Sequence, residues 1–473
     1  MTAPLLIIEQ AEAFERDHKL RLPFRFGVIT LHEVTEVFVR VRLRDANSGV
    51  SAEGYAAELM VPKWFDKSPA LSEADNVNQL RRSVSTALRL SLAEPGPMTA
   101  ADHAWHLDAR QRAELSGENG LVAGFGPALL ACACLDALGH IEQLSFAQLM
   151  QLNRPGLSAA HLPDDLAGFD IDAFLAGLKP QPSIALRHTV GLADALTPAE
   201  LESGLNDGLP ETLSEVIERY QPGYFKVKVS GELDTDLQRL IAIAGQLEPL
   251  PNYRLTLDGN EQFTTAAAFS ELLDAIEATP QLTRLRQSIL FVEQPLHREH
   301  TLDTPVHDLA RRLPLLIDES DADLDSFRRA RELGYLGVSS KACKGLYRSL
   351  INAMRCQHDT SAGCFLSAED LTTQAGLAVQ QDLALVGLLG LDHVERNGHH
   401  FVGRLDGAPA TEVDAFASAH PSLYQRDDKG LSLRIQQGRI ALDSLAGAGF
   451  ASGAVPAFAG MRALTQHDQE ESQ

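Results

Sequence analysis

Hydrophobic and polar residues alternate along residues 224–229, where the chain reads YFKVKV. Successive side chains of a β-strand point to opposite faces, so Lys226 and Lys228 share one face and the apolar residues share the other. A stretch with helical periodicity follows at 234–244, and this order is typical of a βα unit. The helix would cover the apolar face, so both lysines are predicted to point to the inside of the sheet.

The same order of a short apolar run followed by helix-like sequence repeats along the second half of the chain. The candidate strands are 183–188, 224–229, 253–258, 288–293, 313–318, 335–340, 363–368 and 391–395. Eight short strands that alternate with helices favour parallel pairing and a closed barrel. An open doubly wound sheet is the alternative fold, but no GxGxxG motif follows the first strand.

The first 182 residues have a different pattern. Residues from about 20 to 60 alternate on both sides of a turn at 47–49, which predicts an antiparallel hairpin, and helical patterns continue to about 150. The apolar run 121–135 is too short to span a membrane and is predicted to be a buried helix that starts near Pro127. We therefore expect an N-terminal α+β domain with a linker (1–182), a barrel (183–410) and a C-terminal segment (411–473). In that last segment GLSLRIQQGRIAL is expected to form a small strand pair that returns to the first domain.

Composition narrows the class of protein. The chain has 473 residues, 44% of them hydrophobic and 22% charged, which fits a globular protein of two domains. Its net charge of -23 argues against nonspecific binding to nucleic acid or to an anionic membrane. No secretory or membrane segment is visible, and five scattered cysteines without a CxxC pair favour reduced thiols. We expect a cytoplasmic protein that has no nucleic-acid or membrane partner.

Three consecutive predicted strands end in a carboxylate: Asp258 in TLDGNE, Glu293 in FVEQP and Asp318 in LIDES. In a βα-barrel the carboxyl ends of the strands converge on the active site, so these side chains would face one another. Clustered anions repel unless a cation lies among them, and hard carboxylate oxygens favour Mg²⁺ or Mn²⁺. The alternative is that each acid caps the following helix.

Two lysines follow strands on opposite walls of such a barrel. Lys228 ends the second strand and Lys341 the sixth, with the three carboxylates on the arc between them. A lysine acts as a base only when neutral, and nearby positive charge lowers its pKa. The metal and Lys226 could supply that charge to Lys228, and Lys344 to Lys341. The alternative is that the lysines are ion-pair partners of the acids.

This layout predicts proton transfer at carbon. A metal that binds a substrate carboxylate stabilises the charge that develops when the α-proton leaves. One lysine could remove that proton, and the lysine on the opposite face could return one.

The lysine pair of strand two, with DGN, EQP, DES and KxxKG, resembles the enolase superfamily, and within it the muconate-lactonising subgroup of the mandelate racemase/muconate lactonizing enzyme family. The resemblance implies a modified (β/α)₇β TIM barrel with an α+β capping domain, built from the N-terminal part and the C-terminal tail. It implies that Asp258, Glu293 and Asp318 bind Mg²⁺ and that Lys228 and Lys341 are the acid/base pair. Homo-oligomers are common in that family.

The resemblance also suggests residues around this centre. They are Lys226, Asn260, Glu319, Lys344, Ser367, Glu369, Glu395 and Trp64. Glu395 is expected beside Lys341, whereas the Asp-x-Asp of dipeptide epimerases is missing at the eighth strand. His399 and His400 are expected to be loop residues, not ligands. The loop around Trp64 is either a substrate lid or a docking anchor, and the predicted loop 22–27 is a second lid candidate.

Three functions remain open. The first is an Mg²⁺-dependent racemase or epimerase that forms an enolate from a small carboxylate substrate. The second uses the same residues for cycloisomerisation or syn β-elimination, with one lysine as base and the other as electrostatic support. The third is a catalytically inactive barrel that serves binding. The substrate is not encoded in these motifs.

Overall fold

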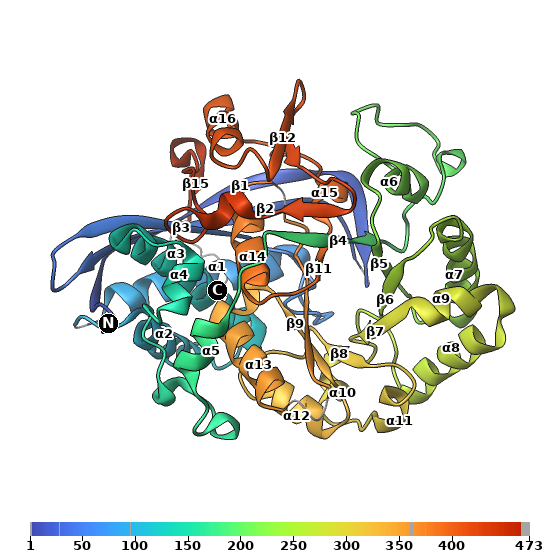
Figure 1. Ribbon diagram of the computed structural model, residues 1–473, viewed down its shortest axis with the longest axis horizontal. Coiled ribbons are helices and arrows are strands. Elements are labelled where there is room, and N and C mark those ends of the chain that lie inside the picture. The colour runs from blue at the N-terminus through green and yellow to red at the C-terminus, as the bar shows by residue number, and fades with distance from the viewer. Residues whose placement is uncertain (1, 28, 95, 360–362, 374, 465–473) are drawn as a thin grey trace.

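Eight parallel strands close into a barrel in the C-terminal part of the protein (Figure 1). The computed structural model describes residues 2–464, apart from 28, 95, 360–362 and 374. The strands are β4 (Ser183–Val190), β5 (Tyr224–Lys228), β6 (Arg254–Asp258), β7 (Ile289–Glu293), β8 (Leu315–Ile317), β9 (Gly337–Ser340), β10 (Phe365–Ala368) and β11 (His393–Arg396). β11 pairs with β4, which closes the sheet and confirms the predicted barrel.

Helices connect the successive barrel strands, so the (β/α)₇β order is also confirmed. They are α6 (Leu213–Tyr220), α7 (Leu233–Leu247), α8 (Ala266–Ala278), α9 (Thr283–Ser288), α10 (Arg298–Thr301), α11 (His307–Ala310), α12 (Ser326–Glu332), α13 (Leu346–His358) and α14 (Leu377–Leu388). Short 3₁₀ turns add η3 (Pro198–Glu200), η4 (Pro280–Leu282) and η5 (Ala342–Lys344).

β5 shows how the alternating pattern is used. Phe225 and Val227 are buried in one apolar cluster with Leu240 of α7, as expected for the face that a helix covers. Lys226 and Lys228 point the other way and are buried inside the barrel.

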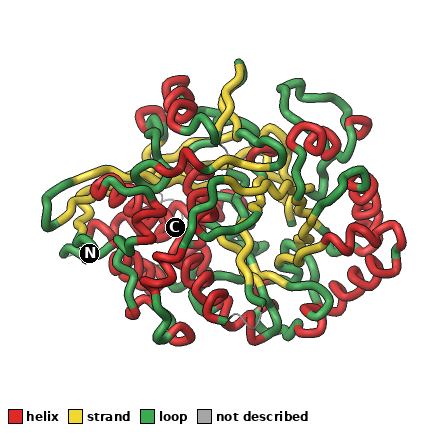
Figure 2. Tube along the Cα trace, viewed as in Figure 1, coloured by secondary structure: helices red, strands yellow, loops and turns green. Residues whose placement is uncertain are grey.

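An antiparallel sheet and a layer of helices form a cap beside the barrel (Figure 2). The sheet has the order β15-β1-β2-β3, with β1 (Leu6–Phe26), β2 (Ile29–Asp45), β3 (Ser51–Leu59) and β15 (Arg462–Ala463). Its helices are α1 (Glu73–Leu92), α2 (Ala100–Glu114), α3 (Gly120–Glu142), α4 (Phe146–Gln151) and α5 (Ile171–Gly177), with turns η1 (Ala159–His161) and η2 (Asp164–Leu166). The β2–β3 hairpin is where the sequence predicted it, but the 21-residue strand β1 was not predicted.

α3 begins seven residues before the predicted start at Pro127. Asn119 caps its first turn by accepting hydrogen bonds from the Leu121 and Val122 amides. A proline inside a helix leaves the carbonyl four residues earlier without its donor. Here that carbonyl belongs to Ala123, and it accepts a hydrogen bond from Gln111 Nε2 (2.7 Å), so the helix continues through the proline. In the described part of the chain α3 is the one helix long and apolar enough to cross a membrane, and its apolar stretch is entirely buried inside the protein.

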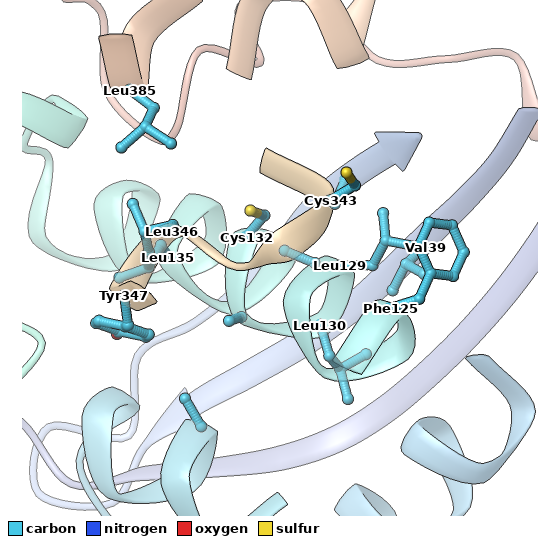
Figure 3. Close-up of a cluster of buried hydrophobic side chains, with 14 of the residues drawn as sticks. Val39, Phe125, Leu129, Leu130, Cys132, Leu135, Cys343, Leu346, Tyr347 and Leu385 are labelled. Carbon is cyan, nitrogen blue, oxygen red and sulfur yellow. The ribbon is translucent and has the colours of Figure 1, made fainter. Parts of the chain in front are cut away.

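α3 joins the cap to the barrel. Its residues Phe125, Leu129 and Leu135 share one apolar core with Cys343 and Tyr347, which follow β9 (Figure 3). On the sheet side, a Cβ at Gly54 of β3 would lie 2.2 Å from the Ala133 carbonyl oxygen, so only glycine permits this approach. The segment that carries Lys341 is therefore packed directly against the cap.

The C-terminal segment corrects one expectation. α15 (Gly398–Phe401) still belongs to the barrel part and follows its last strand. The C-terminal segment comprises α16 (Ala410–Ala419), β12 (Tyr424–Asp427), β13 (Gly430–Leu433), β14 (Arg439–Ala441), η7 (Asp443–Ala446), η8 (Phe458–Gly460) and β15. β13 and β14, which contain most of GLSLRIQQGRIAL, do not pair with each other or with the cap. β13 pairs with β12, and β14 pairs antiparallel with the barrel strand β4. The strand that returns to the cap is β15, which pairs with β1.

Candidate active site

One buried pocket lies where the carboxyl ends of the barrel strands meet the cap. The strand registers place Lys228 opposite Asp258, and Asp258 opposite Glu293, so their side chains reach the same level. Of the predicted residues, the pocket is lined by Lys226, Lys228, Asp258, Asn260, Glu293, Asp318, Lys341, Glu395 and Trp64. The cap closes it with Phe24, Phe26 and Val61, and the barrel adds Asp370, Leu371, Thr372 and Asn397.

The ammonium group of Lys226 lies at the centre of four carboxylates. Its Nζ is 2.9 Å from Asp258, 2.8 Å from Glu293, 3.0 Å from Glu369 and 2.8 Å from Glu395. Burial disfavours the charged form, but these carboxylates outweigh it and raise the pKa of Lys226 well above its ordinary value. Lys226 is thus a fixed positive charge in the floor of the pocket.

The other two lysines face the pocket from strands four places apart. Lys228 Nζ donates to Asp258 Oδ2 (2.8 Å) and to Asn260 Oδ1 (2.6 Å). Lys341 Nζ donates to Asp318 Oδ2 (2.7 Å) and lies 4.5 Å from the centre of the Trp64 ring. Burial alone would lower the pKa of Lys341, but Asp318 outweighs it and raises that pKa. The nearest charge to Lys341 in this arrangement is the negative charge of Asp318.

The three strand-end carboxylates fit a hard divalent cation in donor type, although they are not assembled around an empty centre. Within the described residues, no three acidic, histidine or cysteine side chains converge closely enough to hold a metal as they stand. Each carboxylate is instead bonded to a lysine. Burial, and then the charge of Asp258, raise the pKa of Glu293 well above its ordinary value, so added positive charge would be favourable there. A metal would have to replace ammonium contacts.

A second layer of charge lies below the pocket. Ser367 and Glu369 do not line it; both bond to Arg187, whose Nη2 donates to Ser367 Oγ (2.9 Å). Burial raises the pKa of Glu369 to about 7 against the opposing charge of Arg187 and Lys226. Arg187 is fully buried and was not predicted, although an arginine inside the apolar run SIALRH was a signal for it.

Two further predicted residues lie close to the strand-end carboxylates or to Asn260. Glu319 Oε1 accepts a hydrogen bond from Asn260 Nδ2 (3.3 Å). Lys344 Nζ lies 3.5 Å from Asp318 and 3.2 Å from Asp321, so it offsets the charge of these acids.

Residues of the eighth strand end differ from expectation. Glu395 lies beside Lys226, not beside Lys341, and its other oxygen accepts from Thr189 (2.7 Å). His399 and His400 belong to the short helix α15 and not to a loop, and both rings pack against His188. Burial lowers the pKa of both well below the ordinary value, so both rings are neutral.

A clamp holds the Trp64 segment on the barrel. Arg298 donates to the carbonyl oxygens of Trp64 (2.8 Å) and Phe65 (2.9 Å), and its other side forms a fork with Glu261 (2.8 Å). Lys67 of the same cap segment donates to the Asn260 carbonyl (2.9 Å) and pairs with Glu261. Sequence reasoning missed all three charged residues, although Glu261 directly follows the DGN motif.

Comparison with known proteins identifies the family from the sequence and the fold from solved structures. Residues 209–451 match the family model described as enolase C-terminal domain-like. An o-succinylbenzoate synthase from Geobacillus kaustophilus is 32% identical over 158 residues, which cover 32% of this chain and 38% of that protein. The match therefore spans well under two thirds of the relative.

Solved structures share the fold over nearly the whole chain. A dipeptide epimerase from Enterococcus faecalis, complexed with Mg and the dipeptide L-Leu-L-Tyr, has a TM-score of 0.61 at 15% identity and covers 94% of this chain and 99% of its own. A muconate lactonizing enzyme from Pseudomonas fluorescens, complexed with muconolactone, has a TM-score of 0.59 at 16% identity and covers 95% and 94%. Because the family model matches more than half of the 473 residues, the chain belongs to the enolase superfamily, in the mandelate racemase/muconate lactonizing enzyme family.

Proposed function

We propose that this protein is an enzyme that removes the α-proton of a small carboxylate substrate, most simply as a racemase or epimerase. The observation that carries the proposal is the pair Lys228 and Lys341, which face one pocket from strands four apart. Two amines on opposite walls can reach opposite faces of a carbon held between them. The proton taken by one lysine stays on its Nζ, and the other lysine delivers its own proton to the opposite face.

Asp258, Glu293 and Asp318 would hold Mg²⁺ or Mn²⁺, which supplies electrostatic stabilisation of the charge that develops on the substrate carboxylate. Engaging Asp318 in this way removes the partner that keeps Lys341 charged. Lys226 stays paired with Glu369 and Glu395 and keeps positive charge near both lysines. The relatives crystallised with Mg support the choice of metal.

The pocket has to open for a substrate to enter. Its volume is about 30 Å³, room for roughly one or two water molecules. The parts that cover it are Trp64 and Val61 from one cap segment and Phe24 and Phe26 from another. We propose that both segments act as lids, and their apolar side chains favour a substrate with an apolar group.

The test is hydrogen exchange in D₂O with Mg²⁺, followed by NMR on a panel of N-acyl amino acids, dipeptides and lactones. The wild-type protein should exchange the α-proton of one member and yield both configurations. Lys228→Ala should abolish exchange from one stereoisomer and Lys341→Ala from the other, each by about 10²- to 10⁴-fold. Lys429→Ala, which changes an exposed lysine, is the control. A carboxylate that binds tightly but never exchanges its α-proton would disprove proton abstraction.

Cycloisomerisation or syn β-elimination is the second candidate, and the o-succinylbenzoate synthase match favours it. The two lysines also have different surroundings, since Lys228 bonds the amide of Asn260 whereas Lys341 faces the Trp64 ring. In that reaction only one lysine variant would lose exchange, and the other would lose product formation.

A further inference from the structure

A second cavity lies between the cap helices α2 and α3 and the segment that follows β9. Its volume is about 170 Å³, and it shares no lining residue with the candidate active site. The residues that matter here are Trp105, Asp108, Arg112, Leu324, Tyr347 and Arg348. This cavity is larger than the candidate active-site pocket, which measures about 30 Å³, and it has room for a small ligand.

One wall of this cavity carries a buried cation without a carboxylate partner. Arg348 is 7% exposed, and its Nη1 donates to the backbone oxygen of Asp321 (2.5 Å). Among residues 2–464 that the structure describes, no carboxylate oxygen lies within ion-pair distance of its guanidinium. Burial lowers the pKa of Arg348; Asp321 opposes this effect and Arg112 adds to it. A buried charge with no carboxylate in direct contact is costly, so an anion at this position would be favourable.

A second guanidinium points at the same place. A Cβ at Gly124 would lie 3.0 Å from Arg112 Nη2 and 3.6 Å from Arg348 Nη2, so the bare glycine keeps open a point between the two groups. Arg112 is anchored by its Nε, which donates to Asp108 (2.7 Å). Neither Nη2 atom has a hydrogen-bond partner within the described part of the chain. Two guanidinium groups with free N–H donors are the usual surroundings of a bound carboxylate.

Most of the remaining lining is apolar; the exception is Lys344, whose ammonium is paired with Asp318 (3.5 Å) and Asp321 (3.2 Å). The rings of Trp105 and Tyr347 lie 5.2 Å apart at 63°, and Leu324 and several alanines complete the lining. Aromatic walls stabilise flat or branched hydrocarbon groups. Asp108 at the rim would repel a doubly charged ion such as phosphate more than a single carboxylate.

We propose that this cavity binds a small organic carboxylate, with its anionic end between Arg348 and Arg112 and its hydrocarbon body against Trp105 and Tyr347. The site is separate from the proton-transfer centre, although Lys344 at the start of the same segment donates to Ser339 Oγ (2.8 Å) behind Asp318. The proposal stands whether or not the catalytic one does.

The chain's two tryptophans allow a direct test, because Trp64 belongs to the candidate active site and Trp105 to this cavity. Trp64→Phe leaves Trp105 as the only tryptophan. Benzoate titrated into this protein should change its emission saturably, whereas benzyl alcohol and inorganic phosphate at equal concentration should not. The reciprocal variant Trp105→Phe reports on the active site and shows whether benzoate acts there instead.

Two substitutions in the Trp64→Phe background locate the anion. Arg348→Met should weaken benzoate binding at least ten-fold, and Gly124→Ala should do the same, since its methyl group occupies the point between the guanidinium groups. Alanine is a better helix former than glycine, so Gly124→Ala remains informative even if Arg348→Met does not fold. Arg284→Met, which changes an arginine on the far side of the barrel that also bonds backbone carbonyls, should leave binding unchanged.

Three results would overturn the proposal. They are the absence of a saturable signal in Trp64→Phe, an undiminished signal in Gly124→Ala, and an equal response to phosphate, which would reduce the site to a simple anion site.

Discussion

The Lys341 ammonium lies 4.5 Å from the centre of the Trp64 ring, so a residue of the cap covers a residue of the barrel at the heart of the candidate site. An aromatic face attracts a cation, and such a contact contributes about 0.5–2 kcal/mol depending on its exposure to water. Trp64 is 4% exposed, which places this contact at the stronger end.

Replacement of Trp64 should therefore show how much the ring over Lys341 contributes to catalysis. We expect Trp64→Leu to lower kcat/KM by about ten-fold or more, because it removes the ring over Lys341 and admits water. Trp64→Phe keeps an aromatic face and should lose less. Steady-state kinetics on a substrate found by the exchange screen, with circular dichroism to confirm folding, would measure this. Equal kinetics for Trp64→Leu and wild type would assign the tryptophan to docking alone.

Loss of the strand-end carboxylates should be visible without any substrate. Asp258→Asn, Glu293→Gln and Asp318→Asn should each reduce Mg²⁺ affinity by ten-fold or more in isothermal titration calorimetry, since each removes a charged oxygen donor. Glu369→Gln is the matched control, because Glu369 also pairs with Lys226 but does not line the pocket. Near wild-type binding in two of the three variants would argue against the metal assignment.

The Arg298 clamp should control how firmly the Trp64 segment is held. Arg298→Lys keeps the charge but cannot make the two-sided fork to Glu261 and to both backbone carbonyls. We expect a higher KM and faster proteolysis within residues 61–72, with little change in the melting temperature of the barrel. Limited proteolysis followed by mass spectrometry would locate the cuts, and Arg284→Lys serves as the control. An unchanged cutting pattern would mean that the cap segment is held by its apolar packing.

The stability of the cap should depend on pH through Glu58. Burial raises the pKa of this carboxyl to about 8, with Asp382 adding to the effect and the Leu59 amide opposing it. The folded state therefore holds a proton that the unfolded state releases near pH 4.5, and the free energy of unfolding should fall as the pH rises from about 4.5 to 8. The loss is at most about 1.4 kcal/mol per pH unit.

Glu58→Gln removes this titration and should flatten that part of the curve. Urea unfolding of both proteins at pH 5, 6.5 and 8 would show the difference as a gap that widens with pH in favour of the variant. Parallel curves would mean that Glu58 is charged in the folded protein.

The sequence predicted those parts of the site that depend on local repetition. Asp258 and Glu293 end their strands and Asp318 directly follows its own, one in each of three successive βα units, so the barrel topology alone brings them together. Arg187 and Arg298 were missed because their partners lie far along the chain: Glu369 is 182 residues from Arg187, and Trp64 is 234 residues from Arg298. The sequence pattern around one residue cannot predict a partner that lies so far along the chain.

The missed and misplaced elements also have physical causes. Pro127 does not start helix α3 as predicted, because Gln111 of another helix donates a hydrogen bond to the Ala123 carbonyl that the proline leaves without a donor. β1 lacks a clean alternation because its pairing with β2 shifts register twice, between Ile8 and Gln10 and between Lys19 and Phe24. Each shift moves the following side chains relative to the two faces of the sheet.

β1 also covers the candidate active-site pocket, through Phe24 and Phe26 at its end. Most of the segment 22–27, which was expected to be a loop, is the end of β1: Phe24 and Phe26 pair with Leu31 and Ile29 of β2, and only Gly27 lies outside the strand. To widen the pocket here, the end of β1 has to move, although the rest of that strand is held by its pairing with β2. The stretch between Lys19 and Phe24, where this pairing is irregular, is where β1 would bend. Substitutions that restore regular β1–β2 pairing in this stretch, made to raise the melting temperature, would make the end of β1 more rigid. They would therefore slow the entry and release of the ligand of the pocket.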